Sequence, residues 1–211
     1  MILLPLIVLA IIQGITEFLP ISSSGHLVFV HEIMNDGLSD LDEKRLDIAV
    51  HVGTLLAVIL YFKTDFMGLI IGGLDILRGK FKTAQAHQTW LIAIASIPVV
   101  IAGFALYSFD MTLFDSLHLT GWTTLIFGVL LYIADKRPES EIIFEKFTIK
   151  AALIYGFFQV LALIPGVSRS GITMTAGRFM GHSRKEAARM SLLMGMVTIS
   201  AAGILTGLDV F

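Results

Sequence analysis

The segment EFLPISSSGH, residues 17–26, interrupts the first apolar stretch of the chain with five polar side chains. A strongly polar or ionisable group at membrane depth is unfavourable unless it is paired, and in an apolar sequence it indicates a functional site. The segment also contains Pro20, followed by a run of small polar residues. We therefore predict that a membrane-embedded helix breaks here and that the break carries side chains with a chemical role.

The composition is typical of polytopic membrane proteins. Of the 211 residues, 55% are hydrophobic and 15% are charged, against roughly 25% charged in soluble domains, and mean hydropathy is +0.83. The net charge of −2 gives no indication of nucleic-acid binding, and the lack of cysteine excludes disulfides, thiol catalysis and cysteine-ligated metals. The N-terminal apolar run has no basic segment or small-residue cleavage site, so we expect a mature helix rather than a signal peptide.

Hydropathy predicts six membrane helices and two shorter segments. The six apolar stretches are residues 1–19, 46–62, 88–107, 119–134, 148–164 and 190–208. A helix needs about 20 apolar residues to cross ~30 Å of hydrocarbon. The segments 21–34 and 166–181 each follow a proline and would extend only ~20 Å as helices. We predict that each is a re-entrant half-helix paired with the stretch before it.

Basic residues are unevenly divided between the two predicted faces. If both helix pairs return to the face from which they enter, one face holds the loops 35–45 and 108–118, whose only basic residues are Lys44 and Arg45. The other face holds eleven Lys and Arg residues, in the segments 63–87, 135–150 and 182–189. The positive-inside rule makes this second face cytoplasmic.

A weak internal repeat relates the two breaks. When the sequence is shifted by 146 residues, four residues coincide with their equivalents: Gln13, Ser22, Ser24 and Gly25 with Gln159, Ser168, Ser170 and Gly171. Each copy lies at a predicted break, and the two pairs enter from opposite faces. We therefore predict an all-α, polytopic membrane fold with inverted repeats and two re-entrant helix pairs, an arrangement that can build a binding site at the midplane.

The predicted domain organisation is a single transmembrane domain over residues 1–211. Repeat one, about 1–136, holds a re-entrant pair and three spans, and partial repeat two, about 148–211, holds its pair and one span. Two spans are then missing from the second repeat. We expect either a truncated fragment or a short relative in which another subunit fills the gap.

Both breaks are suited to binding an anion. Irregular backbone at membrane depth is tolerated only where it is buried in protein or lines an aqueous cavity. Each break is rich in Ser and Gly and starts a helix, whose N-terminal N–H groups and dipole favour negative charge. The residues expected to bind phosphate, or to cap the half-helices, are Ser22, Ser24, Gly25, Ser168, Ser170, Gly171 and Thr173.

Glu17 and Arg169 are the leading catalytic candidates. Glu17 lies one helical turn after Gln13, on the same face, and is expected to act as general base, as metal ligand, or as both with the help of Gln13. Arg169 has a planar guanidinium suited to bidentate phosphate contacts. The alternative is a buried ion pair between Glu17 and Arg169 that only fixes the fold.

Four further residues are candidates for supporting or catalytic roles. Ser23 is a candidate nucleophile, although serine also caps helices. His26 can transfer protons near neutral pH, or it can simply cap its helix. Asp47 and His51 lie four residues apart on the following span, where they are expected either to line the cavity behind the catalytic groups or to form an interfacial pair.

Two features are expected to be structural. Arg178, near the cytoplasmic end of its half-helix, is expected to extend its guanidinium to the membrane surface. The segment 72–87 has mixed charge and is predicted to be an interfacial helix or a solvated loop. Neither feature is assigned a chemical role.

Two motifs resemble those of a known family. QGITEFLPISSSGH at 13–26 and PGVSRSGIT at 165–173 closely resemble the signature regions of the bacterial undecaprenyl-pyrophosphate phosphatases, also called bacitracin-resistance proteins. The resemblance implies hydrolysis of the C55 isoprenoid pyrophosphate carrier, which is recycled for cell-wall synthesis. By position it places the family's acidic motif on Gln13 and Glu17, its serine–histidine motif on Ser23 and His26, and its phosphate arginine on Arg169.

The resemblance also implies partners, location and a cofactor. It implies a polyprenyl pyrophosphate substrate, a divalent cation (Mg²⁺ or Ca²⁺) with Glu17 and Gln13 as candidate ligands, no organic cofactor, and often a homodimer. Gln13 stands where many members have a second glutamate. The implied location is the bacterial inner membrane, with several spans and an active site open toward the periplasmic side. The alternative function is a prenyl-phosphate transporter or flippase, because inverted repeats also support alternating access.

Overall fold

The computed structural model describes residues 3–34, 39–108, 116–139 and 147–210, and its regular elements there are all helical. The elements are α1 Leu3–Thr16, α2 Ser23–Met34, α3 Asp40–Tyr61, α4 Lys63–Leu77, α5 Ala84–Ser108, α6 Leu117–Asp135, α7 Ile149–Val160, the 3₁₀ turn η2 Leu161–Leu163, α8 Arg169–Phe179 and α9 Arg184–Val210. The loop segments 35–38, 109–115 and 140–146, which the charge count assigned to the two faces, lie outside the described residues, as do 1–2 and 211.

The all-helical membrane class is confirmed. Among the described residues, three helices are long and apolar enough to cross a membrane, within α5, α6 and α9. Helices α3 and α4 together pass the same test as a fourth candidate span, although they are bent by 90° where they meet. Helix α1 and the unit formed by α7 and η2 are apolar but shorter.

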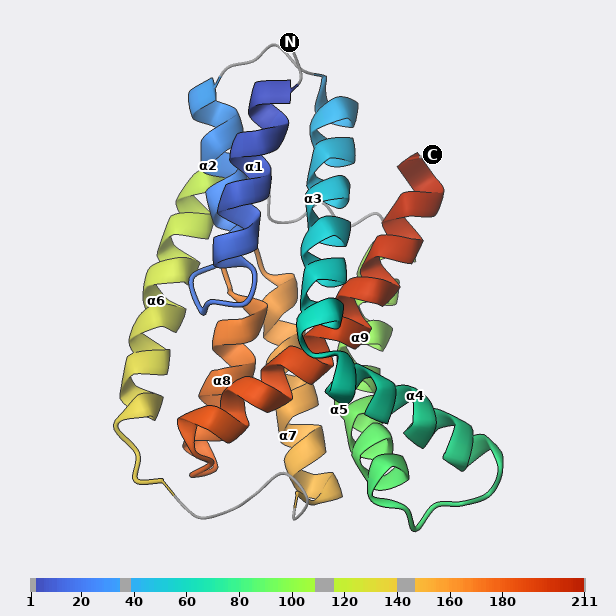
Figure 1. Ribbon diagram of the computed structural model, residues 1–211. Helices are drawn as coiled ribbons and strands as arrows, with labels where there is room; N and C mark the ends of the chain where they lie inside the picture. Colours follow the sequence, from blue (N-terminus) through green and yellow to red (C-terminus); the bar gives the residue numbers. More distant parts are fainter. Residues whose placement is uncertain (1–2, 35–38, 109–115, 140–146, 211) are drawn as a thin grey trace.

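The two predicted breaks lie close together in the middle of the molecule. In Figure 1, α1 and α2 form an antiparallel pair in the upper half, while α7 and α8 form a pair in the lower half. Helix α6 runs along one side and packs against α8 and, more weakly, α2. Helix α8 also packs against α7 and α9, so the second break is held from several sides.

The largest hydrophobic core surrounds the second helix pair. Its fully buried members include Tyr155 of α7, Leu91 of α5 and Met190 of α9. Helices α5 and α7 approach closely because Gly156 of α7 lies against the backbone of Ala95, where any side chain would overlap it. A smaller core of Leu9, Leu27 and Val50 joins α1, α2 and α3. Packing therefore fixes the second break more firmly than the first.

Several helices differ from the sequence prediction, α5 and α9 by beginning at Ala84 and Arg184, before the predicted residues 88 and 190. Helix α3 begins at Asp40, before the predicted residue 46, because the Ser39 hydroxyl caps it by accepting from the Asp42 N–H at 3.2 Å. Helix α4 was not predicted as an element. The segment 72–87, expected to be an interfacial helix or loop, is the end of α4, a turn in which Gly79 has a φ of +75°, and the start of α5.

Candidate active site

Glu17 lies at the centre of a buried hydrogen-bond cluster that joins both breaks. Its side chain is 6% exposed. Oε2 accepts hydrogen bonds from Gln13 Nε2 at 2.8 Å and from Ser23 Oγ at 2.5 Å. Oε1 accepts a hydrogen bond from Arg169 Nη2 at 3.0 Å. A buried carboxylate is tolerated only when donors of this kind surround it.

The last turn of α1 aligns two of these groups. The N–H of Glu17 donates to the carbonyl of Gln13 at 3.0 Å, so the helical geometry continues one residue beyond α1. Residues four apart in a helix lie on one face. The Gln13 amide and the Glu17 carboxylate therefore meet side by side, as the sequence spacing predicts.

The first break directs Ser23 at the carboxylate. Ser22 has a φ of +60°, a left-handed conformation that a residue other than glycine adopts only where its surroundings hold it. The Ser22 hydroxyl accepts from the Gly25 N–H at 3.4 Å, and α2 begins at Ser23. The turn leaves the Ser23 hydroxyl within proton-transfer distance of Glu17.

The second break presents Arg169 at the first position of α8. Gly166, with a φ of +86°, allows the chain to turn, and the Ser168 hydroxyl caps the helix by accepting from the Gly171 N–H at 3.1 Å. The start of α8 therefore places its N-terminal N–H groups and a guanidinium beside the first break, a combination that suits an anion.

Arg169 is supported by α9 as well as by Glu17. Its Nη1 donates to the backbone carbonyl of Ser191 at 3.3 Å, and its guanidinium lies 5.7 Å from the centre of the Phe18 ring. Two of its N–H groups thus have hydrogen-bond partners among the described residues, out of the five that an arginine carries. The guanidinium thus has further donors, which we expect to contact a ligand.

A second direct contact ties the breaks together. The Ser170 hydroxyl donates to the Leu19 carbonyl at 2.8 Å. Thr173 is fully buried, and its hydroxyl makes 2.8 Å hydrogen bonds with the Arg169 carbonyl and the Ser191 hydroxyl. These contacts hold the first turn of α8 against both α9 and the first break.

Two residues of α9 that sequence reasoning missed support the arginine. Ser191 accepts its hydrogen bond, and any side chain at Gly195 would overlap the guanidinium. Both belong to the apolar segment MSLLMGM, and they lie four residues apart. This small-residue face of a helix was the available signal, but nothing in the sequence pairs it with Arg169.

The other predicted residues lie at different distances from the carboxylate. His51 of α3 reaches it, with Nε2 3.6 Å from Glu17 Oε2. Asp47 instead contacts His31, with Oδ1 3.0 Å from the ring Nε2. The ring of His26 donates from Nδ1 to the Ser22 carbonyl at 2.7 Å, and the residue is exposed. The cluster thus gathers Gln13, Glu17, Ser23, His51 and Arg169, whereas Asp47 and His26 lie outside it.

The remaining hydroxyls of the two breaks pair within their own loops. Ser24 Oγ lies 3.4 Å from Ser22 Oγ, and Ser168 Oγ lies 3.0 Å from Ser170 Oγ. The same pairing occurs at equivalent positions of the repeat predicted from sequence. In this structure these groups organise the loops, and whether they also contact phosphate stays a prediction.

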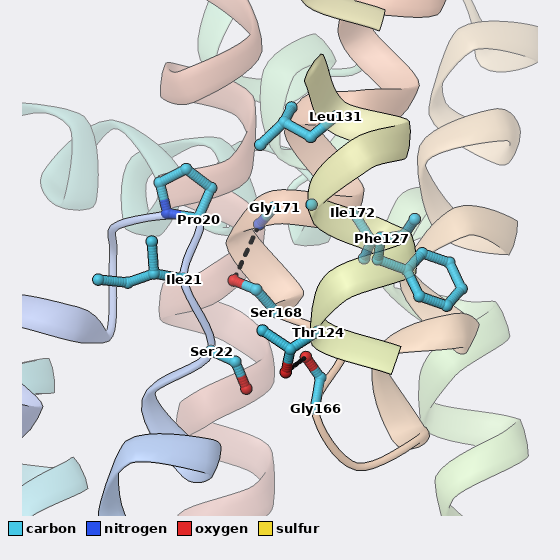
Figure 2. Close-up of a pocket in the computed structure, with 11 residues that line it drawn as sticks. Pro20, Ile21, Ser22, Thr124, Phe127, Leu131, Gly166, Ser168, Gly171 and Ile172 are labelled. Carbon is cyan, nitrogen blue, oxygen red and sulfur yellow. Dashed lines mark hydrogen bonds between the residues drawn. The ribbon is translucent and has the colours of Figure 1, made fainter. Parts of the chain in front are cut away.

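A pocket adjoins the two breaks on the side of α6. Figure 2 shows Pro20, Ile21 and Ser22 of the first break on one wall and residues of α6 on the other, with the start of α8 between them. Thr124 of α6 donates from its hydroxyl to the Gly166 carbonyl at 2.9 Å. The loop at the second break is thereby fixed to α6.

The oxygen donors around Glu17 are of the kind that Mg²⁺ or Ca²⁺ prefers. Gln13 Oε1 is buried without a hydrogen-bond partner in the part of the chain that the structure describes, and so is a candidate ligand beside the carboxylate. Within those residues no group of three or more His, Cys, Asp and Glu side chains could hold a metal ion. A cation here would therefore need phosphate oxygens of the substrate to complete its coordination.

Comparison with known proteins identifies the family. The family model described as "Bacitracin resistance protein BacA" matches residues 6–211. The undecaprenyl-diphosphatase of Jannaschia sp. strain CCS1 is 47% identical over 212 residues, covering 99% of this chain and 77% of the relative. Those of Dinoroseobacter shibae and Hahella chejuensis are 45% and 44% identical, covering 100% and 98% of this chain and 78% and 76% of the relatives. With its two motifs joined at one buried cluster, the chain belongs to the bacitracin resistance protein BacA family.

Proposed function

We propose that this protein is a membrane-embedded hydrolase that removes the terminal phosphate of undecaprenyl pyrophosphate and so returns undecaprenyl phosphate to cell-wall synthesis. The observation that carries the proposal is the meeting of Arg169 and Ser23 on the single carboxylate of Glu17. An anion-binding guanidinium, a hydroxyl and a base are then within reach of one phosphoryl group. The family and the names of its relatives support the same substrate.

Arg169 and the start of α8 bind the diphosphate in this mechanism. The guanidinium exchanges part of its contact with Glu17 for contacts with phosphate oxygens. It then neutralises the charge that develops on the transferring phosphoryl group. Releasing a buried carboxylate from its guanidinium partner also frees Glu17 to accept a proton. Substrate binding and activation of the base are thereby coupled through one ion pair.

Two routes of attack are consistent with the geometry. In the first, Ser23 Oγ attacks the terminal phosphorus while Glu17 Oε2, 2.5 Å away, takes its proton; undecaprenyl phosphate leaves, and water then hydrolyses the phosphoserine. In the second, Glu17 deprotonates a water that attacks the same phosphorus directly. His26, one turn along α2 and exposed, is the candidate to transfer protons with solvent.

A divalent cation is part of the proposal, with Glu17 and Gln13 as its protein ligands. When bound, the ion would polarise phosphate oxygens and neutralise their charge. The unpartnered Gln13 Oε1 supports this role. The two side chains supply one carboxylate and one amide oxygen, which suits the Mg²⁺ habit of binding few protein groups and completing its shell with water and phosphate.

The proposed membrane arrangement is an inverted repeat with two re-entrant helix pairs and a site open toward the periplasm. The 146-residue shift that relates the breaks supports the repeat, and the limited length of α2 and α8 supports re-entrance. The eleven basic residues assigned to the opposite face support the orientation. A homodimer is proposed on the family resemblance alone.

Phosphate release in detergent tests the proposed function. The purified protein is expected to liberate phosphate from undecaprenyl pyrophosphate, and Arg169→Ala and Glu17→Gln are each expected to lower kcat by roughly 10²–10³-fold or more. Arg184→Ala, which alters an exposed arginine of α9, serves as the matched control and should retain activity. Unchanged turnover in both site variants would overturn the site assignment.

The same assay separates the alternative function. A prenyl-phosphate flippase would use Glu17 and His26 for proton coupling and Arg169 for headgroup recognition. Such a protein moves its lipid without cleaving it. Detergent-solubilised protein with no bilayer to cross would then release no phosphate, and transport in reconstituted vesicles would remain.

A further inference from the structure

The turn between α4 and α5 gathers three exposed basic side chains. Arg78, Lys80 and Lys82 lie within the five-residue segment RGKFK, and all three are exposed. None of them forms an ion pair with another residue in the part of the chain that the structure describes. The sequence contains no acidic residue between Asp75 and Asp110. The turn therefore presents a concentrated positive charge to its surroundings.

Hydrogen bonds hold this turn in one conformation. The Thr83 hydroxyl donates to the Asp75 carboxylate at 2.8 Å, and the Lys80 N–H donates to the Asp75 carbonyl at 2.8 Å. Gly79, with a φ of +75°, allows the chain to reverse between them. The carboxylate nearest the basic side chains is thus used to close the turn, and it does not pair with them.

Helix α4 also has an apolar face that no other described element covers. Its opposite face is fixed on α5, where any side chain at Gly72 would overlap the backbone of Gln85, and where the Thr89 hydroxyl donates to the Leu69 carbonyl at 3.1 Å. The outer face follows the i, i+3, i+4, i+7 spacing of one side of a helix. Its residues, 41–50% exposed, are Met67, Ile70, Ile71 and Leu74.

The turn lies at the end of a candidate membrane span. The span within α5 begins at Ala84, directly after the turn, and α4 is bent by 90° from α3. Phe81 in the turn and Trp90 on α5 are 62% and 48% exposed, and aromatic residues are typical of the membrane–water boundary. In Figure 1, α4 and the turn lie at the lower right, away from the two breaks. We infer a position at the depth of the lipid headgroups.

We propose that the outer face of α4 and the α4–α5 turn form a docking surface for anionic phospholipids. The four apolar side chains of α4 contact acyl chains, and Arg78, Lys80 and Lys82 contact the phosphates of the headgroups. A basic amphipathic helix binds anionic bilayers through these two contributions. A nucleic acid would match the charge but would leave the apolar face uncovered. The surface belongs to other helices than the two breaks, so the proposal does not depend on the proposed function.

The enrichment of anionic lipid beside the turn tests the proposal. The chain has no cysteine, so Ala84→Cys and Ser108→Cys each allow one fluorophore to be placed, at the two exposed ends of α5. Each labelled protein is reconstituted in phosphatidylcholine–phosphatidylglycerol vesicles of about 7:3 in which either lipid carries a nitroxide quencher on its acyl chain. The ratio of quenching by the two lipids is expected to be about 3 or more at residue 84 and near 1 at residue 108.

Charge variants show whether the turn causes the enrichment. In the Ala84→Cys protein, the combined change Arg78→Gln, Lys80→Gln and Lys82→Gln is expected to lower the quenching ratio to about 1. The matched control, Lys136→Gln, Arg137→Gln and Lys185→Gln, removes the same charge from exposed residues at the end of α6 and the start of α9. These ends lie at the lower left in Figure 1, on the other side of the molecule from the turn, so the control should keep the wild-type ratio.

Thermal unfolding in detergent checks that each variant is folded. If the triple variant of the turn did not fold, the comparison of residues 84 and 108 would decide alone. Equal enrichment at the two ends of α5, or enrichment at residue 84 that survives removal of the three basic side chains, would overturn the proposal. Loss of enrichment in the control variant as well would also overturn it, because the attraction would then come from the charge of the whole protein.

Discussion

Helix α8 carries two arginines, nine residues apart, whose surroundings differ in kind. Arg169 at its start has a side chain that is 15% exposed and donates to one carboxylate and one backbone carbonyl. Arg178 near its end is 3% exposed and donates to the carbonyls of Asp135, Arg137 and His182 at 2.5–3.0 Å. It also lies 3.3 Å from a carboxylate oxygen of Asp135.

The comparison separates an arginine that holds loops from one that can exchange partners. The three carbonyls around Arg178 belong to the end of α6 and to the turn after α8, and they hold both terminal nitrogens of the guanidinium. Arg169 has fewer partners and stands beside hydroxyls and a helix N-terminus. A phosphate can therefore compete for Arg169, whereas no anion could displace the carbonyls from Arg178 without opening the loops.

The largest effect on stability is expected at Arg178. Arg178→Ala removes the shared donor of three carbonyls and is expected to lower the free energy of unfolding by roughly 3 kcal/mol or more, since bonds to charged groups contribute about 1.5–3 kcal/mol each. Thermal unfolding in detergent measures this loss. The kcat of the folded fraction is expected to stay near the wild-type value, because the residue lies at the opposite end of α8 from Glu17.

Arg184→Ala provides the control for this measurement. Arg184 also pairs with Asp135, but its side chain is 68% exposed, and exposed ion pairs contribute little. If Arg178→Ala unfolded at the same temperature as Arg184→Ala, the description of Arg178 as a structural clamp would be wrong. A selective loss of kcat in Arg178→Ala with unchanged stability would also contradict the comparison.

The two arginines also show what a sequence can predict. Arg169 was identified because it sits in the motif SRSG, next to serines and after a proline, and local sequence is enough to indicate a helix start that binds anions. Arg178 was expected to extend toward the membrane surface, and this was wrong. Two of its three carbonyl partners, those of Asp135 and Arg137, lie more than forty residues away in the sequence. Nothing in the local sequence predicts such contacts.

The same limit applies to the fold. The uncharged stretches 88–107, 119–134 and 190–208 were recognised because hydrophobic length alone predicts a span. Helix α4 was missed because its amphipathic side chains, such as Phe66 and Leu69, acquire their role only by packing onto the core of α5 and α7. Ser191 and Gly195 were missed for the same reason, since an apolar helix does not show which of its faces meets Arg169.

His182 is expected to have an effect of intermediate size, which appears in the pH dependence of the protein's stability. His182, in the turn after α8, is 3% exposed, and burial lowers its pKa from 6.5 to about 4. The unfolded chain therefore binds a proton between these values that the folded chain does not. The stability contributed by neutral His182 is complete above pH 6.5 and decreases as the pH falls toward 4.

His182→Asn isolates this contribution, because asparagine is small, polar and does not titrate. On acidification from pH 7 to 5, the unfolding temperature of the wild type is expected to fall more than that of His182→Asn. The difference reports on His182 alone, because the carboxylates and the other histidines are common to both proteins. Parallel decreases in the two proteins would show that the pKa of His182 is the same in the folded and unfolded states. Activity at pH 7 is expected to be the same in both.

The smallest loss of stability is expected at Tyr155, a buried residue of the hydrophobic core that contacts the turn after α8. The Tyr155 hydroxyl lies 3.0 Å from Nδ1 of His182, and Phe147 stacks on His182 with ring centres 4.1 Å apart. Tyr155→Phe keeps the ring and removes one hydrogen bond, which is expected to cost roughly 1 kcal/mol of stability. Tyr132→Phe, at a tyrosine that is 63% exposed on α6, is the matched control and should unfold like the wild type. Because the Tyr155 hydroxyl lies against Gly177 near the end of α8 and beside His182 in the turn that follows, and not at Arg169, its loss should lower the unfolding temperature without changing KM. A change in KM would mean that the two ends of α8 are mechanically coupled and that the separation between the two arginines is incomplete.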